Sequence, residues 1–161
     1  MVIVSGPAAA TARAASAVRP LVLLRYFVAI GAGNLAWEFA HLPLYTIWQT
    51  ASGGQIVYAA VHCWLGDLLI AAACLGVAVL TTNRSWPTGG YLRAAIAATA
   101  LGVASTNVLE WVNVDVLNDW AYAPSMPTLP ILGTGLSPLL QWLVLPPLAF
   151  VLARPHGLKN A

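Results

Sequence analysis

Asn34–Tyr45 reads NLAWEFAHLPLY and places an acidic and an imidazole side chain near the end of a long apolar run. Glu38 and His41 are three residues apart, so on an α-helix both side chains lie on one face, about one turn apart. Pro43 follows and favours an end to the helix there. Ionisable groups inside a membrane are costly and usually mark functional sites. The stretch therefore predicts a polar site near one end of a transmembrane helix.

The composition of the 161-residue chain predicts that it lies in a membrane. Hydrophobic residues make up 60% of the chain and charged residues only 7%, and the mean hydropathy is +0.78. Soluble domains contain roughly 25% charged residues. Because one span needs about 20 apolar residues, the chain has room for about four or five spans and for no second sizeable domain.

Four apolar segments are long enough to cross a bilayer. They are residues 21–45, 57–80, 94–117 and 136–153. We therefore predict an all-α protein, a four-helix transmembrane bundle over residues 21–153. Residues 1–20 are predicted to be a flexible tail and residues 154–161 a second tail. Ser137 is predicted to cap the fourth helix, with Pro138 at its first helical position.

The basic residues predict how the bundle is oriented. They are Arg13, Arg19, Arg25, Arg84, Arg93, Arg154 and Lys159. None lies in the first or third connection, so the positive-inside rule places both termini and the middle loop in the cytoplasm. We expect a multi-pass protein of the inner (plasma) membrane whose polar site faces the periplasm or the exterior. Because the basic residues follow this boundary, they do not indicate a nucleic-acid partner.

Polar side chains from all four spans, including Gln141 early in the fourth, are predicted to lie at similar depths in the outer half of the bundle. The helical rise of about 1.5 Å per residue puts Glu38, His62 and Glu110 each about 9 Å from the outer end of its span. His41 lies about one turn further out. Imidazole and carboxylate ligands suit zinc, manganese or iron. The sequence therefore predicts a metal site formed by Glu38, His41, His62 and Glu110.

Asp67 and Asn107 lie a turn or more deeper than this layer, where they would orient the metal ligands or relay protons. The sequence leaves open whether the protein is an enzyme. In an enzyme, the metal ion would activate water or a lipophilic substrate. Otherwise the same polar layer would serve a small proton or cation transporter. It could also be a packing network in a homo-oligomer or in a structural subunit of a larger membrane complex.

Two further features have alternative interpretations. His41 and His62 could instead be the axial ligands of a heme held between the first two spans. The third connection, residues 118–135, reads NDWAYAPSMPTLPILGTG and is rich in proline and aromatic residues. It is predicted to be either a lid over an apolar ligand or an aromatic anchor at the membrane interface.

Overall fold

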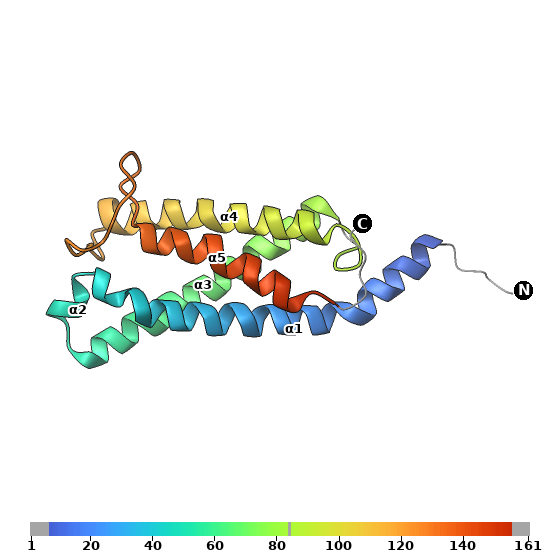
Figure 1. The fold of residues 1–161 in the computed structure, drawn as a ribbon, viewed down its shortest axis with the longest axis horizontal. Helices are drawn as coiled ribbons and strands as arrows, with labels where there is room; N and C mark the ends of the chain where they lie inside the picture. Colours follow the sequence, from blue (N-terminus) through green and yellow to red (C-terminus); the bar gives the residue numbers. More distant parts are fainter. Residues whose placement is uncertain (1–6, 84, 156–161) are drawn as a thin grey trace, which may run out of the picture.

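A computed structural model describes residues 7–83 and 85–155 and contains a bundle of four long helices (Figure 1). They are α1 (Pro7–His41), α3 (Gly53–Thr82), α4 (Tyr91–Trp111) and α5 (Leu136–Ala153). Each contributes a segment that is long and apolar enough to span a membrane. The predicted all-α, four-helix transmembrane bundle is therefore confirmed.

Short elements complete the connections between the long helices. η1 (Leu42–Leu44) and α2 (Ile47–Thr50) join α1 to α3, which begins with a capping box between Ser52 and Gln55. α4 continues as a π-helical segment, η2 (Val112–Val116). Asn118 follows with a φ of 56°, a conformation that asparagine tolerates and that ends a helix. The chain then enters the long irregular connection to α5.

α1 is longer than the span predicted from sequence. It begins at Pro7 rather than at residue 21 and continues through Pro20, and its N-terminal part extends beyond the rest of the bundle (Figure 1). The region before residue 21 is rich in alanine, the residue with the highest helix propensity, so it continues the helix. The predicted flexibility of residues 1–20 stays a prediction. Residues 1–6 and 156–161 of the two predicted tails lie outside the described residues.

The four long helices enclose a common interior. α1 packs against α3 and α5, and α4 packs against the same two helices. In one half of the bundle this interior is an apolar core, whose largest members are Tyr26, Trp86, Trp142 and Phe150. Gly102 of α4 allows Trp142 of α5 to pack directly on the α4 backbone, since a Cβ atom at Gly102 would lie 2.2 Å from Cε3 of Trp142. The opposite half of the interior is polar.

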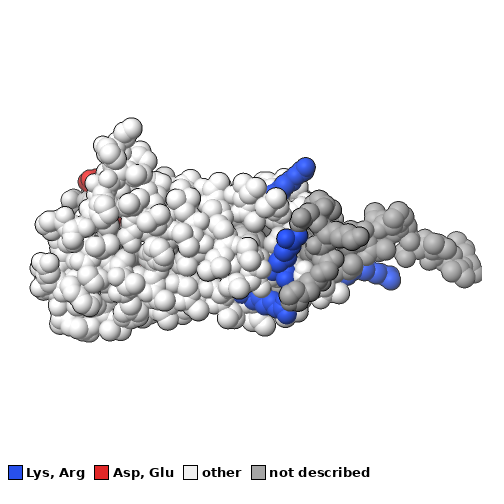
Figure 2. Space-filling view, in the orientation of Figure 1, with Lys and Arg blue, Asp and Glu red and all other residues white. Residues whose placement is uncertain are grey.

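Charged residues separate along the bundle axis (Figure 2). The arginine side chains visible in this view gather at the end where α4 begins, and the acidic side chains appear only at the other end. This arrangement agrees with the basis of the orientation prediction. The orientation itself stays a prediction.

Candidate ligand site in an acidic cavity

All four long helices line a cavity of about 630 Å³ in the polar half of the bundle. Its lining includes four of the chain's five acidic residues and two of its three histidines. They are Glu38, Asp67, Glu110, Asp119, His41 and His62. Among the residues that the structure describes, no lysine or arginine lines this cavity. A cavity lined by acidic side chains and by no described basic side chain is complementary in charge to a cation.

The side-chain amide of Gln141, which is only 2% exposed, connects the acidic groups of two helices. Its Nε2 atom lies 3.1 Å from Oε1 of Glu38 on α1 and 2.8 Å from Oδ2 of Asp67 on α3. It also lies 3.3 Å from Oδ1 of Asn34. An amide nitrogen carries two hydrogens, whereas three oxygens surround it here. The two hydrogens of this amide are therefore shared among three oxygens.

His41 is held by hydrogen bonds at both ring nitrogens. Its Nε2 lies 3.2 Å from Oε2 of Glu38, and its Nδ1 lies 3.2 Å from Oγ of Ser137. The indole Nε1 of Trp37 donates to the same Ser137 oxygen at 3.2 Å. One consistent assignment has Ser137 donating to Nδ1 and Nε2 donating to Glu38. His41 is thereby fixed in orientation next to the Glu38 carboxyl group.

Glu110 on α4 is held by two tyrosines. The hydroxyl groups of Tyr122 and Tyr45 both donate to Oε2 of Glu110, the second at 3.5 Å. The Tyr122 oxygen also accepts a hydrogen bond of 2.9 Å from the backbone nitrogen of Gly135. Near Glu110 in the chain, the Thr106 hydroxyl lines the cavity, is buried and has no hydrogen-bond partner in the structure. It is a polar group available to a ligand.

The connection over residues 118–135 contributes to the wall of the cavity. Asp119 and Trp120 line it. The backbone oxygen of Ala121 accepts a 2.9 Å hydrogen bond from the Thr46 nitrogen, which ties the connection to the segment after α1. Together with the Tyr122 hydroxyl, this contact places the connection over residues that would bind a ligand. A lid would have to lie over the cavity as this connection does. Substitution of Tyr122 therefore tests the lid interpretation.

Replacing Tyr122 by phenylalanine should release this connection. A hydrogen bond of this kind contributes about 0.5–1.5 kcal/mol, so amide hydrogen exchange within residues 118–135 should become about two- to tenfold faster. Exchange followed by mass spectrometry would measure this change. Tyr58→Phe is the matched control, because Tyr58 is 71% exposed. Equal exchange rates in the Tyr122 variant and the wild type would show that the Tyr122 hydroxyl does not hold the connection in place.

The Tyr122 hydrogen bond should also survive over a wide pH range. Burial raises the pKa of the Tyr122 phenol above its ordinary value, and its hydrogen bond to Glu110 raises the pKa further. A group with a raised pKa in the folded state stabilises the fold fully below its unfolded pKa, which is about 10 for tyrosine. This stabilisation is lost only as the pH rises through the raised value. The phenol therefore remains a donor at neutral pH.

The residues predicted as metal ligands all line the cavity but do not converge. Glu38, His41 and Glu110 are buried, whereas His62 is exposed on α3 and stacks on the Tyr58 ring at a centroid distance of 5.7 Å. Within residues 7–83 and 85–155, no group of three His, Cys, Asp or Glu side chains is arranged to hold one metal ion.

Asp67 and Asn107 were predicted to orient the metal ligands or to relay protons. Of the two, only Asp67 lines the cavity. Asp67 shares the Gln141 amide with Glu38 and lines the cavity. Asn107 instead accepts a 3.0 Å hydrogen bond from the Thr134 hydroxyl, and so it holds the long connection against α4. Asp67 is therefore closer to the centre of the site than the sequence indicated.

The sequence also missed or misread several polar groups of the site. The prediction that Ser137 caps α5 is wrong, because Gly135 is the N-cap residue and the Ser137 hydroxyl bonds with His41 and Trp37 instead. Buried indole and imidazole groups need partners, which explains this use of the hydroxyl. Asn34 could have been recognised, since it is four residues before Glu38 and therefore on the same helix face.

Comparisons with protein families, with curated proteins and with solved structures found no match. We therefore infer function from the chemistry of the cavity itself.

Proposed function

We propose that this multi-pass membrane protein binds a cation in its acidic cavity in exchange for a proton held by the Glu38–Asp67 pair. The observation that supports this proposal is the environment of Gln141. Three oxygens, two of them from carboxyl groups, surround an amide nitrogen with two hydrogens. The buried Thr106 hydroxyl, which lacks a partner, is a second polar group that a ligand would engage.

The exchange follows from the cost of charge inside a membrane. Two neighbouring carboxyl groups cannot both be ionised in a region of low dielectric unless a positive charge compensates them. In the empty site a proton provides this compensation. When a cation enters, a carboxyl O–H bond breaks, the proton leaves to water or through His41, and the carboxylate pairs with the cation. The total charge of the site is thereby unchanged for a monovalent cation.

Two classes of cation fit the cavity to different degrees. A divalent or transition metal ion, such as zinc, manganese or iron, would use Glu38 and His41, with Glu110 and His62 moving toward them. The size and the walls of the cavity support an organic ammonium ion instead. The cavity volume of about 630 Å³ is that of a small-molecule pocket, and its walls include Tyr45, Tyr58 and Trp120. Aromatic faces attract ammonium groups, so we favour a lipophilic ammonium ligand.

The proposal assigns a location as well. With both termini in the cytoplasm, the acidic end of the bundle faces the periplasm or the exterior of an inner (plasma) membrane. The cavity would then take its cation from outside the cell. Binding alone does not require catalysis, and the same site would serve a small cation transporter or the ligand-binding subunit of a membrane complex.

Calorimetric titration of detergent-purified protein tests the proposal. The probes are benzylammonium, Zn²⁺ and Mn²⁺, each titrated in two buffers of different ionisation enthalpy. We expect about one proton released for each monovalent cation bound, since one charge replaces another. Glu38→Gln and Asp67→Asn should each weaken binding at least tenfold. Asp115→Asn is the matched control, because Asp115 is an exposed acidic residue outside the cavity lining.

The outcomes separate the possibilities. Metal binding without ammonium binding would retain the cation site and reject the ammonium ligand. An absorption spectrum of the purified protein tests for heme, and a Soret band would replace the cation proposal by a heme site. Well-folded protein that binds none of the three probes, or binds them without proton release, would contradict the proposed exchange.

A further inference from the structure

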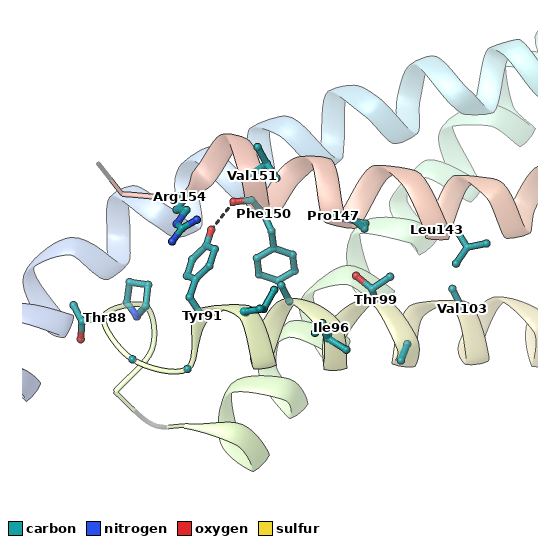
Figure 3. A pocket seen from close by; sticks show the side chains of 16 residues that line it. Thr88, Tyr91, Ile96, Thr99, Val103, Leu143, Pro147, Phe150, Val151 and Arg154 are labelled. Atoms are coloured by element: carbon teal, nitrogen blue, oxygen red, sulfur yellow. Dashed lines mark hydrogen bonds between the residues drawn. The ribbon is translucent and has the colours of Figure 1, made fainter. Parts of the chain in front are cut away.

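A second cavity lies at the basic end of the bundle, between α4 and α5 (Figure 3). Its volume is about 940 Å³. Ala95 and Thr99 of α4 contribute small side chains, and these leave room between the larger residues around them. Leu92, Ile96 and Val151 also line the cavity and are between 61% and 71% exposed. On a transmembrane bundle, such exposed apolar residues face lipid, so this cavity is a groove open to the bilayer.

The groove has the length of one membrane leaflet. Its α4 lining runs from Tyr91 to Val103, which at about 1.5 Å per residue is about 18 Å. Half of a bilayer's hydrocarbon core is about 15 Å thick. The groove therefore extends from the basic end of the bundle to about the membrane midplane.

The charged residue of the groove stands at its mouth. Arg154, at the end of α5, lies beside Tyr91, whose hydroxyl donates a 2.6 Å hydrogen bond to the Phe150 backbone oxygen (Figure 3). Towards the midplane, the groove is bounded by Val103 and Leu143. Among the described residues, no aspartate or glutamate lines it. A positive charge at the headgroup level above an apolar channel is complementary to an anionic phospholipid.

We propose that this groove binds an acyl chain of an anionic phospholipid from the leaflet at the basic end, with the lipid headgroup against Arg154. The chain replaces packing that Ala95 and Thr99 cannot provide, and the guanidinium selects the headgroup by charge and by hydrogen bonding. This site is separate from the acidic cavity. The lipid-binding proposal can therefore be tested independently of cation binding.

Lipid retention in native mass spectrometry tests the groove. Protein in mild detergent is incubated with equal amounts of phosphatidylglycerol and phosphatidylcholine, and the lipids that stay bound are counted. We expect retained phosphatidylglycerol in the wild type and its loss in Ala95→Leu and Thr99→Leu, which fill the groove. Ala104→Leu is the control for the filling variants, because Ala104 is exposed on α4 outside the groove lining.

The preference for anionic lipid is tested at the mouth of the groove. One basic side chain near a membrane surface changes anionic-lipid binding by about fivefold. Arg154→Gln should therefore lower the preference for phosphatidylglycerol by about this factor, and Arg154→Lys should keep most of it. Arg93→Gln, an exposed arginine outside the groove lining, should leave the preference unchanged.

Four results would overturn the proposal. Equal retention of both lipids would remove the charge selection. Retention that survives Ala95→Leu, or that falls equally in Ala104→Leu, would place the lipid elsewhere. A dimer that Ala95→Leu converts into a monomer would make the groove an interface between copies of the chain.

Discussion

Replacing Gly102 by alanine should prevent α5 from packing closely against α4 and should destabilise the bundle. The new Cβ atom would lie 2.2 Å from Cε3 and 2.7 Å from Cζ3 of Trp142, far inside van der Waals contact. The indole is a rigid ring that is only 3% exposed, so it cannot move aside without displacing its neighbours. Overpacking typically costs about 1–3 kcal/mol, and the rigid indole puts this substitution at the upper end of that range. Thermal unfolding in detergent, followed by size-exclusion chromatography, should show a large loss of stability.

The same substitution at Gly76 is the matched control. Gly76 lies within α3, and a Cβ atom there would meet nothing within 4 Å. Alanine should therefore leave stability unchanged or raise it by about 0.5–1 kcal/mol, because glycine is the poorer helix former. If Gly102→Ala and Gly76→Ala unfold at the same temperature, α4 and α5 do not pack through Trp142 as the structure has them.

The second large effect is expected at Gln141. Replacing it by leucine keeps the approximate size of the side chain but removes the amide that serves Asn34, Glu38 and Asp67. Buried oxygens that lose their donor are expensive, and breaking a buried charged network costs about 3–5 kcal/mol. The unfolding transition in detergent at neutral pH should therefore shift to a lower temperature. Gln49→Leu, at an exposed position of α2, should cause little change.

A double variant separates the network from simple packing. When both partners of a buried hydrogen bond become apolar, the cost is much smaller than when one partner is left alone. Asp67→Leu should therefore restore a large part of the stability that Gln141→Leu removes, and the two changes should be clearly non-additive. Additive losses would mean that Gln141 and Asp67 do not share a hydrogen bond.

Much of the fold could be predicted because it depends on composition and length. The four apolar segments are each long enough to span a membrane, and no alternative use of so many apolar residues competes with that one. The boundaries were less predictable. The start of α1 was missed because the alanine-rich residues before Leu21 were read as a tail, although alanine favours a helix.

The site was predictable only where it follows helical spacing. Glu38 and His41 do contact each other, because the i, i+3 relationship is a local property of a helix. The positions of Asp67 and Tyr122 depend on how separate segments pack, which local sequence spacing does not predict. Asp67 contacts Gln141 across 74 positions of sequence, and Tyr122 belongs to an irregular connection. His62 shows the converse case, since its estimated depth was informative but its direction around the helix was not.

The depth of Asp67 has a consequence for a cell with an energised membrane. Asp67 lies near the middle of α3, 14 residues after Gly53 and 15 before Thr82. If the acidic end of the bundle faces the exterior, as proposed above, a monovalent cation that reached Asp67 from outside would cross about half of the transmembrane voltage. A full crossing is equivalent to about 2.3 kcal/mol per 100 mV, so half is about 1.2 kcal/mol, or about a sevenfold change in affinity. With the interior negative, cation occupancy at this depth would rise with membrane potential, and the departing proton would oppose that rise if it left by the same path.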